Sequence, residues 1–272
     1  MTVLTRSKGG IVAGKCEARV AVVTGGSRGI GRAIAEALLA EGASVAICGR
    51  SEEKGKTALD EMGAGDRGHF VACDVRQQDE VEGFIDAAAA HFGSLDILVN
   101  NAGGSDGFAR VHELTDQAWQ NALAWNLNST FWATRRALPH MLRDGWGRII
   151  TISSIEGKQA NKPAISHYIT NKHAINGFVK AVACEYGPDG ITSNAICPGA
   201  IETDTMRDAG AVAAAAAGIS YEEFLARYAQ ESMIKRLNTA EEVAAVAVLL
   251  ASDAGAGITG GLLNVDGGSA PW

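Results

Sequence analysis

Tyr168 and Lys172 stand four positions apart in a segment whose pattern predicts a helix over residues 164–185. Side chains at this spacing lie on one face of a helix, so the phenol and the ammonium are neighbours. A cation beside a phenol favours the phenolate and lowers the pKa of the tyrosine. Such a group can give a proton to a ketone oxygen and take one from an alcohol. This spacing is common by chance, so its meaning depends on the rest of the chain.

A glycine-rich segment, Thr24-Gly-Gly-Ser-Arg-Gly-Ile-Gly31, follows the first predicted strand and begins a predicted helix. Its glycines have the spacing G-x-x-x-G-x-G rather than the more familiar G-x-G-x-x-G. Missing side chains let the backbone approach a pyrophosphate, and the positive end of the helix favours the anion. The segment therefore predicts a binding site for the phosphates of a dinucleotide.

Short β-branched runs alternate with amphipathic stretches along the chain. Strands are predicted at residues 19–24, 44–49, 69–74, 95–100, 148–153, 191–197 and 258–265, and helices at 30–41, 51–62, 77–91, 115–142, 164–185 and 240–251. Strands that are continuously apolar indicate a parallel sheet buried on both faces, and repeated βα units imply right-handed crossovers. We expect a single-domain α/β fold, a Rossmann-type doubly wound parallel sheet of about seven strands with helices on both faces.

Two segments fall outside this regular alternation. Residues 1–18 are expected to form an N-terminal extension to a domain spanning 19–272, and they lack the apolar region of a secretion signal. Residues 199–236 are too long for an ordinary connection between a strand and a helix. Because ligands bind at the carboxyl ends of the strands in such sheets, we expect this stretch to form a lid over a substrate. The alternative is a surface loop without a role.

Composition excludes several classes of function. The formal net charge of −7, with no basic stripe, argues against a nucleic-acid partner. No run approaches the roughly 18 apolar residues of a membrane span. The five cysteines show neither a C-x-x-C pair nor a metal-ligand spacing, so we expect no metal, a reducing compartment and a cytoplasmic location.

From about Arg19 to Gly268 the chain resembles the short-chain dehydrogenase/reductase family, in particular its 3-oxoacyl reductases and 3-hydroxybutyrate dehydrogenases. The segments that carry the resemblance are Thr24–Gly31, Asn100-Asn-Ala-Gly103, Ser154, Tyr168 with Lys172, Pro198-Gly199 with Thr203, and Val265-Asp-Gly-Gly268, in the order of the family. The resemblance implies an NAD(P)-dependent oxidoreductase that interconverts a secondary alcohol and a ketone.

The resemblance also implies catalytic roles. Tyr168 would be the acid/base, and Lys172 would lower its pKa and bind the nicotinamide ribose. Ser154 would polarise the carbonyl, whereas Ser153 would point into the structure. Asn126 would hold a water that links Lys172 to solvent, with Asn128 as a nearby alternative.

The cofactor contacts that the resemblance implies surround the glycine-rich segment and the ends of later strands. They are Gly25, Ser27, Arg28, Gly29, Ile30, Gly31, Arg50, Asp74, Val75, Asn101, Ala102, Gly103, Tyr168, Lys172, Pro198, Gly199, Ile201 and Thr203. Asp74 would bind the adenine amino group, and the region from Pro198 to Thr203 has the alternative role of a turn and a helix cap. Arg28 and Arg50 near the adenosine ribose favour NADP(H), with NAD(H) possible.

The substrate is less determined by the sequence. Ser105, Glu156 and Gln159 are candidate contacts, and Glu156 departs from the pattern of the hydroxybutyrate dehydrogenases. A 3-oxoacyl thioester or related ketone is the first expectation, and a cyclic, sterol-like or small hydroxy-acid alcohol is the alternative. A non-catalytic cofactor-sensing scaffold is the alternative of another class. Family resemblance of the helical segments 115–142 and 164–185, and of the C-terminal residues up to Trp272, implies a homotetramer.

Overall fold

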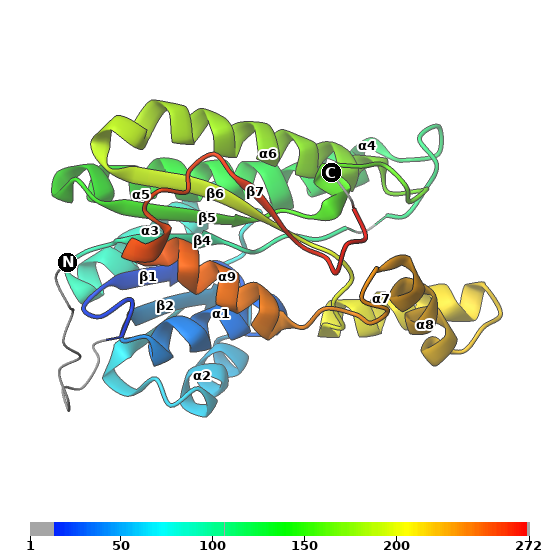
Figure 1. Cartoon of the computed structure of the whole chain (residues 1–272), viewed down its shortest axis with the longest axis horizontal. Helices are drawn as coiled ribbons and strands as arrows, with labels where there is room; N and C mark the ends of the chain where they lie inside the picture. The colour runs from blue at the N-terminus through cyan, green and yellow to red at the C-terminus, as the bar shows by residue number, and fades with distance from the viewer. Residues whose placement is uncertain (1–13, 106, 271–272) are drawn as a thin grey trace, which may run out of the picture.

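The computed structural model describes residues 14–105 and 107–270. Its strands are β1 Val20–Val23, β2 Ser44–Gly49, β3 Gly68–Ala72, β4 Ile97–Asn100, β5 Gly147–Ile152, β6 Ile191–Pro198 and β7 Leu262–Val265. They form one parallel sheet in the order β3-β2-β1-β4-β5-β6-β7 (Figure 1). The order reverses direction between β1 and β4, which is where ligands bind in doubly wound sheets. The predicted fold class is confirmed.

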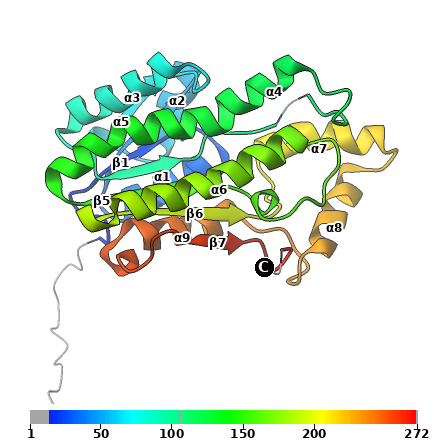
Figure 2. The same cartoon turned by 90° about the horizontal axis from the view of Figure 1, so that it is seen from above.

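Helices cover both faces of the sheet (Figure 2). On one face lie α1 Gly29–Ala40, α2 Glu52–Glu61 and α9 Ala240–Ala251, and on the other α3 Gln78–Phe92, α5 Ser129–Asp144 and α6 Ser166–Tyr186. Successive side chains of a strand point to opposite faces of the sheet, so each strand contributes to a hydrophobic core on both faces. Ala21 and Val23 pack with Ile34 of α1, whereas Val22 packs with Phe84 of α3. This two-sided burial explains why the strands are continuously apolar.

The predicted helix at 115–142 is interrupted. It consists of α4 Asp116–Leu123, a π-helical turn Ala124–Asn128, and α5. Ser129 Oγ donates to the Trp125 carbonyl oxygen at 2.8 Å, and Thr130 Oγ1 donates to the Asn126 carbonyl oxygen at 2.8 Å. Hydroxyls that bond preceding carbonyls compete with the regular helical ladder, and π turns are often found at functional sites. A prediction from hydrophobic periodicity does not detect such an interruption.

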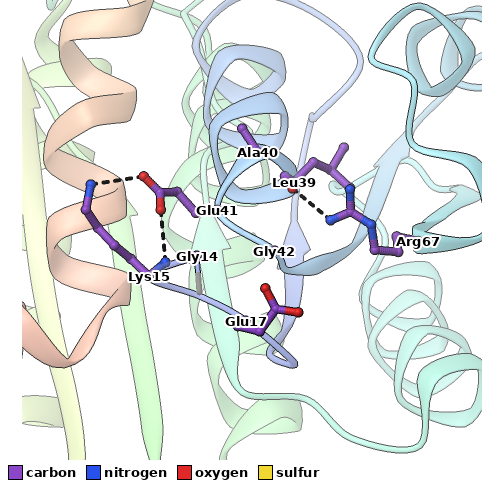
Figure 3. A pocket seen from close by; sticks show the side chains of 8 residues that line it. All are labelled: Gly14, Lys15, Glu17, Leu39, Ala40, Glu41, Gly42 and Arg67. Carbon is purple, nitrogen blue, oxygen red and sulfur yellow. Dashed lines mark hydrogen bonds and ion pairs between the residues drawn. The ribbon is translucent and has the colours of Figure 1, made fainter. Parts of the chain in front are cut away.

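Residues 14–18, which precede the predicted domain boundary at residue 19, contact the end of α1. Cys16 is 1% exposed, and its N–H donates to the Glu41 carbonyl oxygen at 2.9 Å. Lys15 binds the Glu41 carboxylate through both its backbone nitrogen and Nζ, each at 2.9 Å (Figure 3). Together with Arg67 and the end of α1 they line a hollow of about 530 Å³. It lies at the carboxyl end of α1, away from the predicted site. Residues 1–13 lie outside the described residues.

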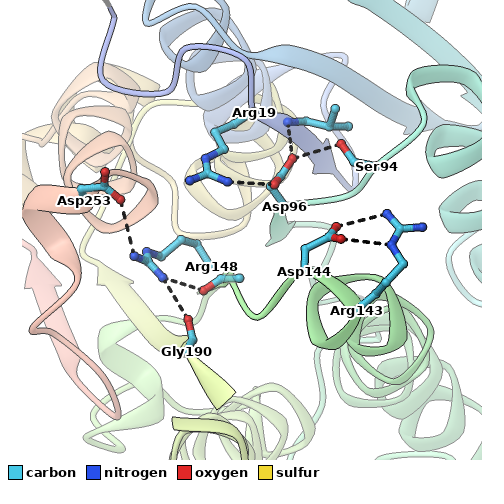
Figure 4. Close-up of polar contacts among 10 residues, drawn as sticks. Arg19, Ser94, Asp96, Arg143, Asp144, Arg148, Gly190 and Asp253 are labelled. Carbon is cyan, nitrogen blue, oxygen red and sulfur yellow. Dashed lines mark hydrogen bonds and ion pairs between the residues drawn. The ribbon is translucent and has the colours of Figure 1, made fainter. Parts of the chain in front are cut away.

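The amino-terminal edge of the sheet is a structural network. Arg19 Nη1 donates to Asp96 Oδ1 at 3.1 Å, and Ser94 Oγ donates to Asp96 Oδ2 at 3.2 Å (Figure 4). The guanidinium carbons of Arg19 and Arg148 lie 3.6 and 4.2 Å from the Trp146 ring centroid. These charged groups bind one another and the indole, which leaves the opposite edge of the sheet for a ligand. In the part of the chain described, no helix has the length and apolarity to span a bilayer.

Candidate active site

The loops after β1 and β4 are tied together at the carboxyl edge of the sheet. Thr24 Oγ1 accepts the N–H groups of Asn101 and Ala102, each at 3.0 Å. The Asn101 amide donates back to the carbonyl oxygens of Thr24 at 2.9 Å and Gly25 at 3.2 Å. Thr24 therefore joins the glycine-rich loop to the predicted Asn101–Gly103 segment. The resemblance assigned no role to Thr24, although this residue is the first of the glycine-rich segment.

The glycines of this loop are required by its geometry. Gly25 and Gly29 have φ of +66° and +54°, a region that side chains rarely adopt. A Cβ on Gly31 would clash with Asn101 Nδ2. Helix α1 begins after Arg28, whose side chain makes no capping hydrogen bond. The backbone N–H groups of the first turn thus remain for an anion, and the site fits the phosphates of a dinucleotide.

The segment after β6 reaches the same loop. Thr203 caps α7 Asp204–Ala216 by accepting the Met206 N–H at 3.3 Å, and its methyl carbon lies 3.4 Å from where a Cβ on Gly29 would stand. Gly199 N–H donates to the Val265 carbonyl oxygen at 3.0 Å, and Ile201 is 7% exposed. The Pro198–Gly199 turn and the Thr203 helix cap are therefore both present. Thr203 lies beside Gly29, the first residue of α1. A hollow of about 230 Å³ opens between these elements.

The adenosine end of the predicted site lies where β2 and β3 finish. A Cβ on Gly49 would stand 3.2 Å from Ser27 Oγ, so the glycine-rich loop lies against the end of β2. This contact places Arg28 and Arg50 at the same edge. Both side chains are exposed, and neither forms a hydrogen bond or ion pair with any residue in the described ranges.

Asp74 has a partner that the sequence analysis missed. Arg76 donates to Asp74 Oδ1 from its backbone nitrogen at 3.1 Å and from Nε at 3.0 Å. The hydrogen bond from the Arg76 side chain holds the pKa of Asp74 below its usual range, and the charge of Arg50 adds to this effect. The Asp-x-Arg spacing was the available signal. Val75, between them, is buried.

Strand β5 and helix α6 bring the predicted catalytic groups together. Ser154 follows β5, precedes the 3₁₀ turn Ile155–Gly157, and accepts the Glu156 N–H on Oγ at 3.1 Å. Its side chain also lies close enough to the Tyr168 phenol to lower the pKa of that group. Ser153 instead is 3% exposed, with Oγ directed to the Lys172 carbonyl oxygen at 3.4 Å. The structure therefore places Ser154, rather than Ser153, beside the tyrosine.

Burial dominates the electrostatics of Tyr168 and Lys172. Lys172 is 4% exposed, its Nζ donates to the Ile152 carbonyl oxygen at 2.8 Å, and it lies 5.5 Å from the Tyr168 ring centroid. Desolvation lowers the pKa of Lys172 to about 8. Desolvation also raises the pKa of Tyr168, and the Ser154 hydroxyl opposes this shift. In the protein alone the pKa of Tyr168 therefore shifts upward, and a lowering of this pKa by Lys172 stays a prediction.

Asn126 lies in the π-helical turn and is 1% exposed. Its Oδ1 accepts the Gly104 N–H at 3.2 Å, and its Nδ2 donates to the carbonyl oxygens of Gly104 and Ala122, each at 2.9 Å. A Cβ on Gly103 would stand 2.7 Å from Asn126 Oδ1 and 3.5 Å from Lys172 Nζ. The side chain thus holds the loop after β4 next to the lysine.

The candidate substrate residues lie around Tyr168. Ser105 Oγ is 3.2 Å from Nε2 of His167, the residue before the tyrosine. Glu156 is 6% exposed, and burial raises its pKa. Glu156 Oε2 and Gln159 Nε2 are buried atoms without a hydrogen-bond partner among the residues described.

The predicted lid is a pair of helices, α7 and α8 Tyr221–Glu231, which project beyond the end of the sheet in Figure 1. Lys162, between Ser154 and Tyr168, binds both carboxylate oxygens of Glu231 at 2.6 and 2.8 Å. This link between the lid and the catalytic segment was not predicted. Within the described ranges, no group of three or more His, Cys, Asp or Glu side chains could hold a metal ion.

Known proteins share this arrangement along nearly the whole chain. The family model described as enoyl-(acyl carrier protein) reductase matches residues 25–270. A 3β-hydroxysteroid dehydrogenase from Mediterraneibacter gnavus is 36% identical over 96% of this chain and 98% of its own length. A D-β-hydroxybutyrate dehydrogenase from Cupriavidus necator is 36% identical over 92% and 97%.

Among solved structures, a single-residue variant of the actinorhodin polyketide ketoreductase with NADPH is 36% identical and superposes with a TM-score of 0.89, covering 96% of this chain and 100% of its own. A relative of this identity and coverage shares the fold and the order of its elements. The chain therefore belongs to the short-chain dehydrogenase/reductase family, and it is an oxidoreductase that acts on CH–OH groups with a nicotinamide cofactor.

Proposed function

We propose that the protein is an NADP(H)-dependent ketone reductase in which Tyr168 is the acid/base, with a 3-oxoacyl thioester or a related ketone as its substrate. The observation that carries the proposal is that the ammonium of buried Lys172 lies 5.5 Å from the Tyr168 ring centroid, and that Ser154 acts on the same phenol, at the edge where the glycine-rich loop opens. The polyketide ketoreductase of similar structure supports this class of substrate.

The positions of the side chains support the following roles. Ser154 donates a hydrogen bond to the carbonyl oxygen and orients it toward Tyr168. Tyr168, protonated because burial raises its pKa, gives the oxygen its proton. Lys172 stabilises the phenolate that Tyr168 becomes and would bind the ribose of the cofactor. Asn126 holds the loop after β4 next to Lys172. The nicotinamide ring, when bound, supplies the hydride to the carbonyl carbon.

The preference for NADP(H) is supported by the residues at the adenosine end. Arg28 and Arg50 are exposed cations at one edge, and no acidic residue directly follows β2. An acidic residue at that place would repel a 2′-phosphate, whereas a cation attracts it. The contacts proposed for Asp74 with adenine and for Thr203 with the phosphates belong to the same assignment.

The test is a ketone panel assayed with NADPH and with NADH. The wild type should reduce a ketone and use NADPH at the lower KM, and Tyr168→Phe should lose about 10²–10⁴-fold in kcat. Tyr186→Phe, at the end of the same helix, is the matched control and should keep its activity. Near-normal turnover by Tyr168→Phe would remove the tyrosine from the mechanism, and a lower KM for NADH would overturn the cofactor assignment.

The 3β-hydroxysteroid dehydrogenase favours a second candidate, a cyclic or sterol-like secondary alcohol. Oxidation of such alcohols without reduction of oxoacyl thioesters in the same panel would select it. We also propose a cytoplasmic location, supported by five cysteines that are all free thiols.

A further inference from the structure

Glu156 is a carboxyl group enclosed at the catalytic segment. It is two residues beyond Ser154, and its backbone N–H binds the Ser154 hydroxyl at 3.1 Å. The residue is 6% exposed, and its Oε2 atom is buried without a hydrogen-bond partner among the described residues. Its charge also reaches the neighbouring phenol, where it adds to burial in raising the pKa of Tyr168. A carboxylate in this position is costly, so its presence calls for an explanation.

The nearest cation does not neutralise this carboxyl group. Burial raises the pKa of Glu156, whereas the charge of Lys162, the Asn161 backbone and the Gln159 side chain each lower it by less. The Lys162 ammonium binds both oxygens of Glu231 at 2.6 and 2.8 Å and lies 4.5 Å from the Tyr228 ring centroid. The charged and titratable groups that act on Glu156 or respond to it are thus Lys162 from its own segment, Glu231 from α8 and Tyr168 from α6. The two carboxyl groups, those of Glu156 and Glu231, are thus close to a single ammonium, that of Lys162.

We propose that Glu156 is a specificity-determining residue whose negative charge acts at the Ser154–Tyr168 segment and selects substrates that are neutral next to the reacting carbonyl. A carboxylate or phosphate group near the reacting carbonyl would meet a like charge in a site of low polarity, where repulsion is strong. A 3-oxoacyl thioester or a sterol-like ketone is neutral at that position, whereas a small keto acid is not. The inference rests on the proposed function and names its substrate class.

The probes are methyl acetoacetate and acetoacetate, which share a ketone and differ in the charge of the neighbouring group. For the wild type, kcat/KM should be at least about tenfold higher for the neutral ester. Glu156→Gln should reduce this ratio, mainly by raising kcat/KM for the acid. Lys162→Gln should increase the ratio, because it removes the one positive charge that acts on Glu156 within the described part of the chain.

The matched control is Glu223→Gln. Glu223 is a glutamate of α8, where it is exposed and pairs with Arg227 at 2.9 Å. The substitution removes a negative charge of the same size away from the Ser154–Tyr168 segment, so the ratio of this variant should equal that of the wild type. Equal ratios for the wild type, Glu156→Gln and Lys162→Gln would overturn the inference while leaving the proposed function intact.

A second readout needs no substrate. The phenolate absorbance of Tyr168, isolated by subtracting the Tyr168→Phe titration, should appear at lower pH in Glu156→Gln than in the wild type. An unchanged titration would show that the carboxyl group does not act at the phenol and would also overturn the inference. If the wild type reduces no ketone, the proposed function fails. The titration still decides whether the negative charge of Glu156 acts on the Tyr168 phenol.

Discussion

Burial drives Lys172 and Tyr168 toward their neutral forms. It lowers the pKa of the lysine to about 8 and raises that of the tyrosine. A protonated phenol is the form that donates a proton to a ketone oxygen, so the protein alone is prepared for reduction. Oxidation requires the phenolate, and its rate should therefore rise with pH. Sequence spacing indicates that the two side chains meet, but it carries no information about how deeply they are buried.

The lysine should cost stability at neutral pH. Its pKa falls from the usual 10.5 to about 8 in the folded state. The folded protein therefore binds this proton less well than the unfolded chain, and the cost is full below about pH 8 and fades as the pH rises toward about 10.5. Lys172→Met should gain about 1–2 kcal/mol in free energy of unfolding at pH 7, after losing the hydrogen bond to Ile152.

Urea unfolding of Lys172→Met and the wild type at equal protein concentration, near pH 7 and near pH 10, measures this difference. The advantage of the variant should shrink at the higher pH. A difference of the same size at both values would mean that the ammonium is not desolvated as described. The control is Lys56→Met, whose ammonium is exposed and pairs with Glu52 at 2.7 Å.

Among the elements, the π-helical turn Ala124–Asn128 determines the position of Asn126. The pattern of residues 115–142 predicts one helix. The segments on either side of the turn are helical as predicted, and they are α4 and α5. The extra residue in the turn directs the Asn126 amide to Gly104, where it bonds both the N–H and the carbonyl oxygen. Such a bridge between segments distant in sequence is invisible to local periodicity.

Asn126→Ala should therefore weaken the protein and loosen the loop after β4. The loss leaves three backbone groups without their partner, and we expect about 1–3 kcal/mol lower stability together with a weaker Kd for the cofactor. Asn128→Ala is the matched control, because Asn128 lies in the same turn without a side-chain hydrogen bond to the described residues. Calorimetry and urea unfolding measure both effects. Equal behaviour of the two variants would contradict the assignment of Asn126 over Asn128.

On the scale of the whole molecule, we propose assembly into a homotetramer through α5 and α6. Phe131 of α5 is 40% exposed and contacts Phe178 of α6 at a ring-centroid distance of 6.0 Å. Leu142, also on α5, is 41% exposed. Large apolar side chains exposed on adjoining helices are suited to contact a second copy related by a two-fold axis. The expected contact of Trp272 lies outside the described residues.

Sedimentation of the wild type should give the mass of a tetramer. Phe131→Asp should shift it to smaller species, because a buried charge without a partner opposes association. Val212→Asp, on the lid and 72% exposed, is the control and should sediment like the wild type. A wild type that sediments only as a monomer would contradict the proposal.

By itself the sequence determined the βα alternation, the parallel sheet and the order of its motifs, because hydrophobic period and glycine spacing are local properties. It also brought Ser154, Tyr168 and Lys172 into one site through the resemblance they carry. Tertiary structure alone decided the protonation tendencies of Tyr168 and Lys172, and the pairing of Lys162 with Glu231. Desolvation and hydrogen bonding depend on atoms that folding brings together from distant segments, such as Glu231 of the lid against Lys162 of the catalytic segment.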